Sequence, residues 1–166
     1  MNSPLPNYQL LGIPNGKAGV RKTLDLMADL VEKFKTNQQV RELAVRIVSR
    51  VPAKNWAKEV QALQEWVKHN IRYTMDVKGV ETLQTPVKTL ELKAGDCDDH
   101  AILLASLLST INHDARFVAV GKYPDQFSHV FVQAKIGSRW FAIETTKNWP
   151  MGHFPMKIKS KMVHHL

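Results

Sequence analysis

The sequence contains one cysteine, no internal repeat and no long apolar run. A single cysteine cannot form a disulfide within the chain, so the fold has to be stable without crosslinks. The N-terminal residues lack the basic and then apolar pattern of a secretory signal. No stretch approaches the roughly 20 apolar residues that a membrane-spanning helix needs. We therefore expect a cytoplasmic protein whose cysteine is reduced.

Length and charge restrict the architecture and the partners. A chain of 166 residues can form one domain that buries about two thirds of its unfolded surface. There are 13 basic and 7 acidic residues in residues 1–80, and 10 against 8 in the remainder. Because the basic residues alternate with acidic ones along amphipathic segments, they are typical of a solvated surface, and nucleic-acid binding is not expected. Residues 147–166 contain four lysines and no acidic residue, which indicates a basic tail.

The order of patterns predicts helices first and strands later. Residues 1–18 are rich in proline and glycine and are expected to form a flexible arm, followed by a single domain over residues 19–166. Its helical half, residues 19–72, has apolar residues at helical spacing in three stretches; Pro52 ends the second and Asn55 can cap the third.

Beyond the helical half, residues 73–146 form the predicted catalytic core. Residues 76–94 show no sustained periodicity and are expected to form a long ordered loop beside a cleft. A last short strand is expected over residues 156–158.

The cysteine stands directly in front of an apolar run. Residues 95–100 read Gly-Asp-Cys-Asp-Asp-His, and residues 101–108 are rich in helix-forming apolar side chains. Asp96 can therefore cap a buried helix that begins at Cys97, Asp99 can complete a capping box, and Gly95 permits a sharp turn.

This position favours a reactive thiol, although not on its own. The free N–H groups and the dipole at a helix N-terminus stabilise a thiolate. Three neighbouring carboxylates oppose the ionisation of Cys97, so a partner base is needed. A cysteine in a cytosolic protein is more often simply buried among apolar residues. A metal site formed by residues 96–100 is not expected, because the ligand order of a calcium loop is missing.

Two β-rich runs supply a base and a carboxylate. Gly137 and Ser138 separate the two runs and predict a hairpin. Counting outward from this turn places His129 and Glu144 as diagonal neighbours on one face of the hairpin. A carboxylate beside one imidazole nitrogen fixes the tautomer, and the other nitrogen can then accept a proton from a nucleophile. Taken singly, His129 and Glu144 are better interpreted as a hydrogen-bonded strand histidine and an exposed strand carboxylate. Together with Cys97, at compatible positions, they favour a catalytic set instead.

The order of these motifs over residues 60–146 resembles the transglutaminase-like superfamily. The matching segments are the Gly-Asp-Cys-Asp-Asp-His-Ala string, the helix after it, the Ser-His-Val-Phe-Val strand and the Trp-Phe-Ala-Ile-Glu-Thr-Thr strand. The resemblance implies an α+β, papain-like fold in which N-terminal helices and the helix of the nucleophile pack on an antiparallel sheet. It also implies that Cys97 is the nucleophile, His129 the general base and Glu144 the third member of a triad. The family usually has aspartate at this third position.

The implied reaction is acyl transfer at an amide or peptide bond of a peptide or protein, with no cofactor. A cysteine peptidase or amidase is the favoured interpretation, with a protein-glutamine transglutaminase as an alternative. A third possibility is a binding or structural module with a vestigial triad, since compact relatives occur in bacterial and phage gene sets. Gln84, Tyr73 or the main-chain N–H of Cys97 could supply an oxyanion hole. For Gln84, a plain loop residue is the favoured interpretation.

Overall fold

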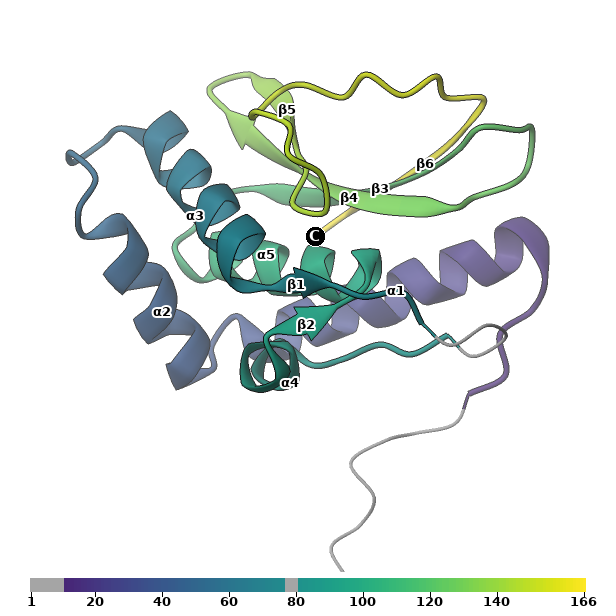
Figure 1. The fold of residues 1–166 in the computed structure, drawn as a ribbon, viewed down its shortest axis with the longest axis horizontal. Helices are drawn as coiled ribbons and strands as arrows, with labels where there is room; N and C mark the ends of the chain where they lie inside the picture. Colours follow the sequence, from purple (N-terminus) through teal and green to yellow (C-terminus); the bar gives the residue numbers. More distant parts are fainter. Residues whose placement is uncertain (1–10, 77–80) are drawn as a thin grey trace, which may run out of the picture.

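The computed structural model describes residues 11–76 and 81–166 and contains helices on one side of an antiparallel sheet (Figure 1). The helices are α1 (Gly16–Phe34), α2 (Gln38–Val48), α3 (Trp56–Asn70), α4 (Pro86–Leu92) and α5 (Cys97–Thr110). The strands are β1 (Arg72–Tyr73), β2 (Ala94–Gly95), β3 (Ala115–Gly121), β4 (His129–Ile136), β5 (Arg139–Ile143) and β6 (Ser160–His165). This arrangement confirms the predicted α+β class.

The main sheet has the strand order β5-β4-β3-β6, and every neighbouring pair is antiparallel. The β4–β5 hairpin has the predicted register, with Ile136 opposite Arg139 and Val132 opposite Ile143. A separate two-stranded parallel pair joins β1 to β2 and places Tyr73 opposite Gly95. This short pair connects the end of α3 to the start of α5.

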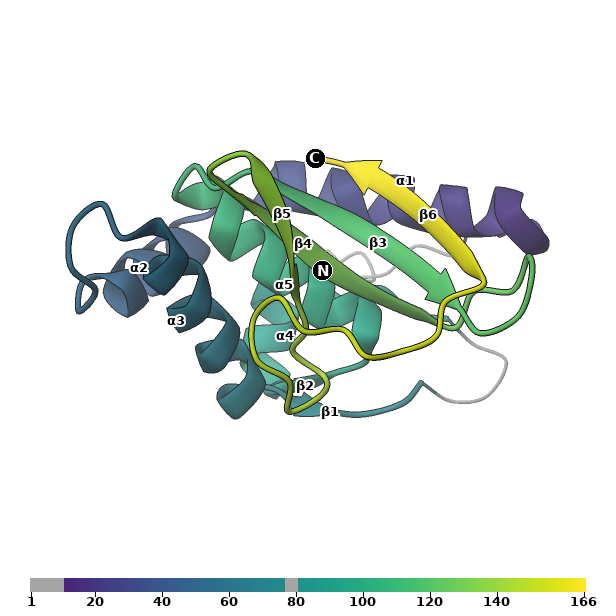
Figure 2. The ribbon, with the colours of Figure 1, turned by 90° about the horizontal axis from the view of Figure 1, so that it is seen from above.

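Helix α5 is the centre of the core. Residues 101–108 are all buried, because the sheet covers one side of the helix and α1, α2, α3 and α4 surround the rest (Figures 1 and 2). Each of Ile102, Leu103 and Leu104 is 0% exposed. A helix enclosed on all sides needs apolar residues around its whole circumference, and this explains the apolar run in the sequence, which only Ser106 interrupts.

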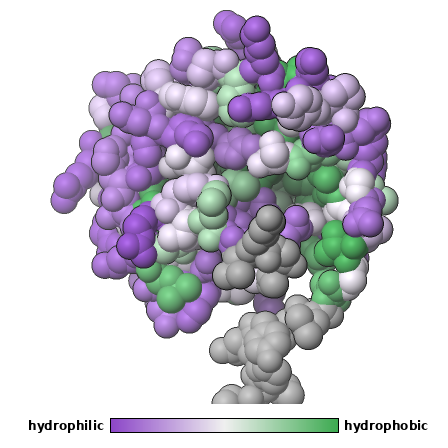
Figure 3. Space-filling model, turned by 45° about the vertical axis from the view of Figure 1, so that its right-hand side comes forward, coloured by the Kyte–Doolittle hydropathy of each residue, from purple (hydrophilic) through white to green (hydrophobic). Residues whose placement is uncertain are grey.

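The three N-terminal helices have the expected apolar faces, and the second and third have side-chain caps. Asn37 and Asn55 each accept a hydrogen bond from the main-chain N–H three residues later, at 3.2 Å in both cases. These side chains satisfy N–H groups that have no partner within the helix. The prediction that Asn55 caps the third helix is therefore confirmed. The face shown in Figure 3 is mostly hydrophilic, with apolar residues in small separate groups.

Three expectations about local structure were wrong. The first helix begins at Gly16, earlier than expected, and the part of the predicted arm within residues 1–10 lies outside the described residues. Residues 76–94 do not form one long loop, because they contain α4, where Thr85 caps the helix and Pro86 occupies its first turn. The last strand covers Ser160–His165 and not residues 156–158, since pairing with β3 determines its position.

Candidate functional site

The start of α5 is a complete capping box. The Asp96 carboxylate accepts hydrogen bonds from the main-chain N–H groups of Asp98 and Asp99, at 3.0 and 3.1 Å, and the Asp99 carboxylate accepts from the N–H of Asp96 at 3.1 Å. A Cβ atom at Gly95 would lie 2.5 Å from the Cβ of Asp99, so this approach requires glycine. The predicted cap is confirmed, and it fixes Cys97 as the first residue of the helix.

The Cys97 thiol is half-buried, and its surroundings favour the protonated form. Burial raises the pKa of this thiol, and the neighbouring Asp98 carboxylate raises it further. The sulfur donates a hydrogen bond to Asp98 Oδ1 at 3.6 Å. A hydrogen bond from the main-chain N–H of Val130 opposes these effects but does not outweigh them. The helix N-terminus therefore does not ionise the thiol without a base, as the acidic sequence around it indicates.

His129 and Glu144 are in direct contact at the end of the hairpin. The distance from His129 Nε2 to Glu144 Oε2 is 2.6 Å, and the Glu144 side chain is 1% exposed. Burial by itself would raise the pKa of Glu144, but the hydrogen bond and the charge of His129, together with hydrogen bonds from Thr146, lower it below its usual range. Because an ionised carboxylate only accepts hydrogen bonds, Nε2 of His129 is the donor. The predicted His–carboxylate pair is present.

The second oxygen of Glu144 is held by the next two residues. Glu144 Oε1 accepts hydrogen bonds from the main-chain N–H groups of Thr145 and Thr146 at 2.8 and 2.7 Å, and from Thr146 Oγ1 at 2.9 Å. These three donors fix the orientation of the carboxylate while Oε2 remains available to His129. The extra methylene of glutamate, compared with the usual aspartate, does not prevent this contact.

The thiol lies at the same end of β4 as the histidine. Val130, whose N–H reaches the Cys97 sulfur, is the residue directly after His129. Because Nε2 of His129 is bound to Glu144, the ring nitrogen that remains for another partner is Nδ1. The start of β4, which carries the His129–Glu144 pair, thus lies beside the first turn of α5, which carries Cys97.

The two side chains that are candidate oxyanion donors have different environments. Gln84 donates its side-chain amide to Asp99 Oδ2 at 2.8 Å, and its main-chain N–H to Asp99 Oδ1, also at 2.8 Å. This glutamine therefore supports the capping box, and we do not assign it to an oxyanion hole. Tyr73 is 43% exposed and lies beside the first turns of α5, with its ring 6.3 Å from that of His100 in a T-shaped arrangement.

Several residues that support the site were not identified from the sequence. His100 is 1% exposed and its Nδ1 lies 3.2 Å from Thr145 Oγ1, so it links α5 to the end of β5. Burial lowers the pKa of His100 to about 4, and the ring is neutral at physiological pH. Gln64 is 0% exposed on α3 and donates to the carbonyl of Glu144 at 2.9 Å. The sequence contains one signal that could have identified Gln64, because it is a polar residue on the apolar face of a predicted helix.

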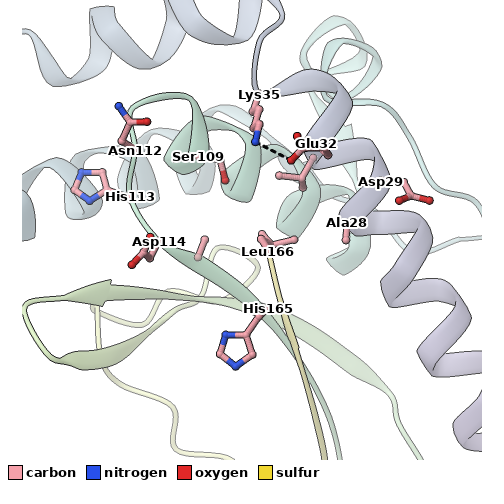
Figure 4. A pocket seen from close by; sticks show the side chains of 12 residues that line it. Ala28, Asp29, Glu32, Lys35, Ser109, Asn112, His113, Asp114, His165 and Leu166 are labelled. Carbon is pink, nitrogen blue, oxygen red and sulfur yellow. Dashed lines mark ion pairs between the residues drawn. The ribbon is translucent and has the colours of Figure 1, made fainter.

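A cavity of about 400 Å³ lies away from these residues. Figure 4 shows it between α1, the C-terminal end of α5 and the end of β6, where Lys35 pairs with Glu32. Cys97 is at the other end of α5, so this cavity does not belong to the candidate active site.

Within residues 11–76 and 81–166, no group of three or more His, Cys, Asp or Glu side chains is arranged to hold a metal ion. In the same ranges, no helix has the length and apolar character needed to cross a bilayer.

Comparison with family models identifies the class of protein. The model of the transglutaminase-like superfamily matches residues 41–145. This match covers more than half of the 166 residues, so the chain belongs to the transglutaminase-like superfamily, and the predicted family is confirmed. No protein of curated function matches the sequence at a significant level.

Solved structures share the fold at low sequence identity. A candidate cysteine protease from Cytophaga hutchinsonii has a TM-score of 0.58 and 16% identity, over 84% of this chain and 55% of that chain. A candidate protease from Parabacteroides distasonis has a TM-score of 0.59 and 15% identity, over 77% of this chain and 27% of that chain. LapG from Legionella pneumophila, in a calcium-bound form, has a TM-score of 0.52 and 12% identity, over 86% of this chain and 87% of that chain. The present chain thus spans about half of the first of these proteins and about a quarter of the second.

Proposed function

We propose that this protein is a cysteine peptidase or amidase that transfers an acyl group from an amide bond of a peptide or protein to Cys97 and then to water. The observation that carries the proposal is the His129–Glu144 pair at 2.6 Å, next to the only cysteine of the chain at the N-terminus of a buried helix. Nucleophile, base and orienting acid are the three parts that such a reaction requires.

In the first step, Nδ1 of His129 accepts the thiol proton as the Cys97 sulfur bonds to the carbonyl carbon, and the π electrons of the carbonyl move to its oxygen. When this intermediate collapses, the C–N bond breaks and the imidazolium gives its proton to the leaving amine. Water then attacks the thioester, His129 accepts a proton from that water, and the proton returns to the sulfur as the acid leaves. Because burial and Asp98 raise the pKa of the Cys97 thiol, the thiol keeps its proton until His129 accepts it at the moment of attack.

Glu144 orients the imidazole in this scheme. Its ionised oxygen fixes the proton on Nε2 of His129 and stabilises the imidazolium that forms in both steps. A neutral residue of the same shape would keep the contact but lose the charge. The low pKa of Glu144 supports this role, because the carboxylate remains ionised throughout the neutral range.

Hydrolysis is favoured over amine transfer by the solved relatives, since two of them are described as candidate proteases. Capture of the thioester by a primary amine, as in a protein-glutamine transglutaminase, would use the same three residues. The two reactions differ only in the second step, so the fate of the acyl group distinguishes them.

The test is acylation by p-nitrophenyl acetate, a small activated ester that does not depend on substrate specificity. Wild type is expected to release p-nitrophenolate and to carry an acetyl group on Cys97, located by peptide mass spectrometry. Cys97→Ala should remove this label, and His129→Ala should slow its formation by about 10²- to 10⁴-fold. His69→Ala, at an exposed histidine of α3, is the matched control and should react as wild type does.

Three outcomes separate the alternatives. Release of acetate, with no conjugate when glycine ethyl ester is added, supports the hydrolase. Formation of N-acetylglycine ethyl ester as the main product favours amine transfer. If wild type is acetylated no faster than a free cysteine peptide and His129→Ala has no effect, the proposal is wrong and the non-catalytic module is the better interpretation.

A further inference from the structure

The proposed reaction places negative charge on the former carbonyl oxygen, and this oxygen needs hydrogen-bond donors beside Cys97. The main-chain N–H of Cys97 is one candidate: within residues 11–76 and 81–166 it has no hydrogen-bond acceptor. A single donor is a weak oxyanion hole, because such sites usually combine two. The side-chain amide of Gln84 is not free to be the second, because it donates to Asp99 Oδ2 at 2.8 Å and to the carbonyl of Ala94 at 3.4 Å.

Tyr73 is held beside the nucleophile by the short parallel strand pair. It lies opposite Gly95 in the register of β1 and β2, only two residues before Cys97. The main-chain N–H of Thr74 donates to the carbonyl of Gly95 at 2.8 Å and fixes this register. The position of Tyr73 therefore depends on main-chain hydrogen bonds and is well defined, although its side chain is partly exposed.

The aromatic ring is oriented by a second contact. It meets the ring of His100 edge to face at 6.3 Å and an interplanar angle of 65°. His100 is one turn after Cys97 on α5 and is itself anchored to Thr145, next to Glu144. The tyrosine ring thus lies beside the first turn of α5, which begins at Cys97 and which His100 links to the end of β5.

The chemistry of the phenol suits a neutral donor. Partial burial raises the pKa of Tyr73, and so do the nearby acidic groups of Cys97, Asp96 and Glu144. The hydroxyl therefore remains protonated at neutral pH and can donate a hydrogen bond. A lysine or arginine at this place would instead form an ion pair with these carboxylates.

We propose that the Tyr73 hydroxyl, together with the main-chain N–H of Cys97, forms the oxyanion hole of the proposed acyl-transfer site. The inference rests on the proposed function. No proton is transferred from Tyr73: its O–H donates a hydrogen bond to the oxygen as the carbonyl π electrons move there. The bond weakens again when the tetrahedral intermediate collapses to the thioester. Tyr73 thus acts on the acylation step and not on the ionisation of the thiol.

The experiment compares two reactions of the same sulfur in wild type and Tyr73→Phe. Acylation by p-nitrophenyl acetate passes through an oxyanion, whereas alkylation by iodoacetamide is a direct displacement at carbon and forms none. We expect Tyr73→Phe to acylate about 10- to 100-fold more slowly than wild type. Removal of one oxyanion-hole donor usually slows a reaction by about 10²- to 10³-fold. The effect expected here is at or below the lower end of that range, because water can partly replace a hydroxyl at an exposed position. The rate of alkylation by iodoacetamide should change less than twofold.

Two controls make the result specific. Tyr123→Phe, at a tyrosine that is 62% exposed on the β3–β4 connection, should leave both rates unchanged. An unchanged unfolding midpoint of Tyr73→Phe would show that the ring contact with His100 still holds the strand pair.

Equal acylation by wild type and Tyr73→Phe would overturn the inference while leaving the proposed function intact. A parallel loss of acylation and alkylation would also overturn it, since it would show that Tyr73 affects the thiol and not the oxyanion. Absence of Cys97 acylation in wild type would instead refute the proposed function, and the inference with it.

Discussion

Replacing Asp98 with asparagine should make Cys97 more reactive. The Asp98 carboxylate accepts a hydrogen bond from the thiol at 3.6 Å and, after burial, is the largest contribution to its raised pKa. Asparagine has nearly the same shape but no charge. The substitution therefore removes one like charge from the neighbourhood of the thiolate and leaves the packing of the first turn of α5 in place.

The size of this effect follows from the separation of the two groups. Unit charges about 4 Å apart interact by about 1 kcal/mol in water and about 4 kcal/mol near a protein surface. This corresponds to a decrease of about one to three units in the pKa of Cys97. The thiolate then becomes about 10 to 1000 times more abundant, but each thiolate is less nucleophilic because its pKa is lower. The net acceleration of alkylation at pH 8 is about 3- to 50-fold.

The assay is the rate of iodoacetamide labelling of Cys97 between pH 5 and 9, followed by intact mass. Burial, followed by the neighbouring Asp99, Glu81 and Asp76, outweighs the hydrogen bond from Cys97 and raises the pKa of Asp98 to about 6. Below this pH the wild-type carboxyl is itself neutral, so the ratio of the two rates should decrease towards one. Asp29→Asn, at an exposed residue of α1 near the far end of α5, should match wild type throughout. An Asp98→Asn variant that is folded and reacts no faster than wild type at pH 8 would refute the reasoning.

Three further changes test the supports of the site. Gly95→Ala places a Cβ atom 2.5 Å from Asp99 Cβ and should disturb the capping box. The free energy of unfolding, measured in urea, should decrease by at least about 1 kcal/mol. Unchanged stability would contradict the close approach. Glu144→Gln should be less stable than wild type at pH 7, because ionised Glu144 stabilises the folded state. This difference should begin to decrease as the pH falls below the ordinary pKa of glutamate, about 4.3, and should be lost as the pH falls through the lowered pKa of Glu144. A difference of unchanged size at pH 2 would show that charge is not the cause. Leu104→Ala, at a position that is 0% exposed, should cost about 2–5 kcal/mol in the same urea experiment, whereas a loss below 1 kcal/mol would contradict its central place in the core.

The predictable part of the site depends on local rules. The cap of α5 follows from residue types within four positions of Cys97, and the contact of His129 with Glu144 follows from counting along one hairpin. Both need only neighbouring residues or a single turn. This is why they could be derived from one sequence, and why the structure reproduces them.

The wrong, open and missed assignments all lie where tertiary contacts decide. Thr85 and Pro86 are good signals for a helix start, but α4 has only seven residues, too few to show a helical period. Gln84 could be either a donor to substrate or a structural residue, and its contact with Asp99, 15 residues away, decides its observed role. Gln64 donates a hydrogen bond to the carbonyl of Glu144, which is 80 residues further along the chain. A pattern within one segment of the sequence cannot reveal such a contact.

The central claim is that His129 and Glu144 act as one unit on Cys97, and a double-mutant cycle tests it most directly. The measurement is the rate of Cys97 acetylation by p-nitrophenyl acetate in wild type, His129→Ala, Glu144→Gln and the double variant. If Glu144 acts only through the imidazole, the double variant should react as slowly as His129→Ala alone, with no additional loss. Losses that multiply, or a Glu144→Gln variant as fast as wild type, would contradict the account.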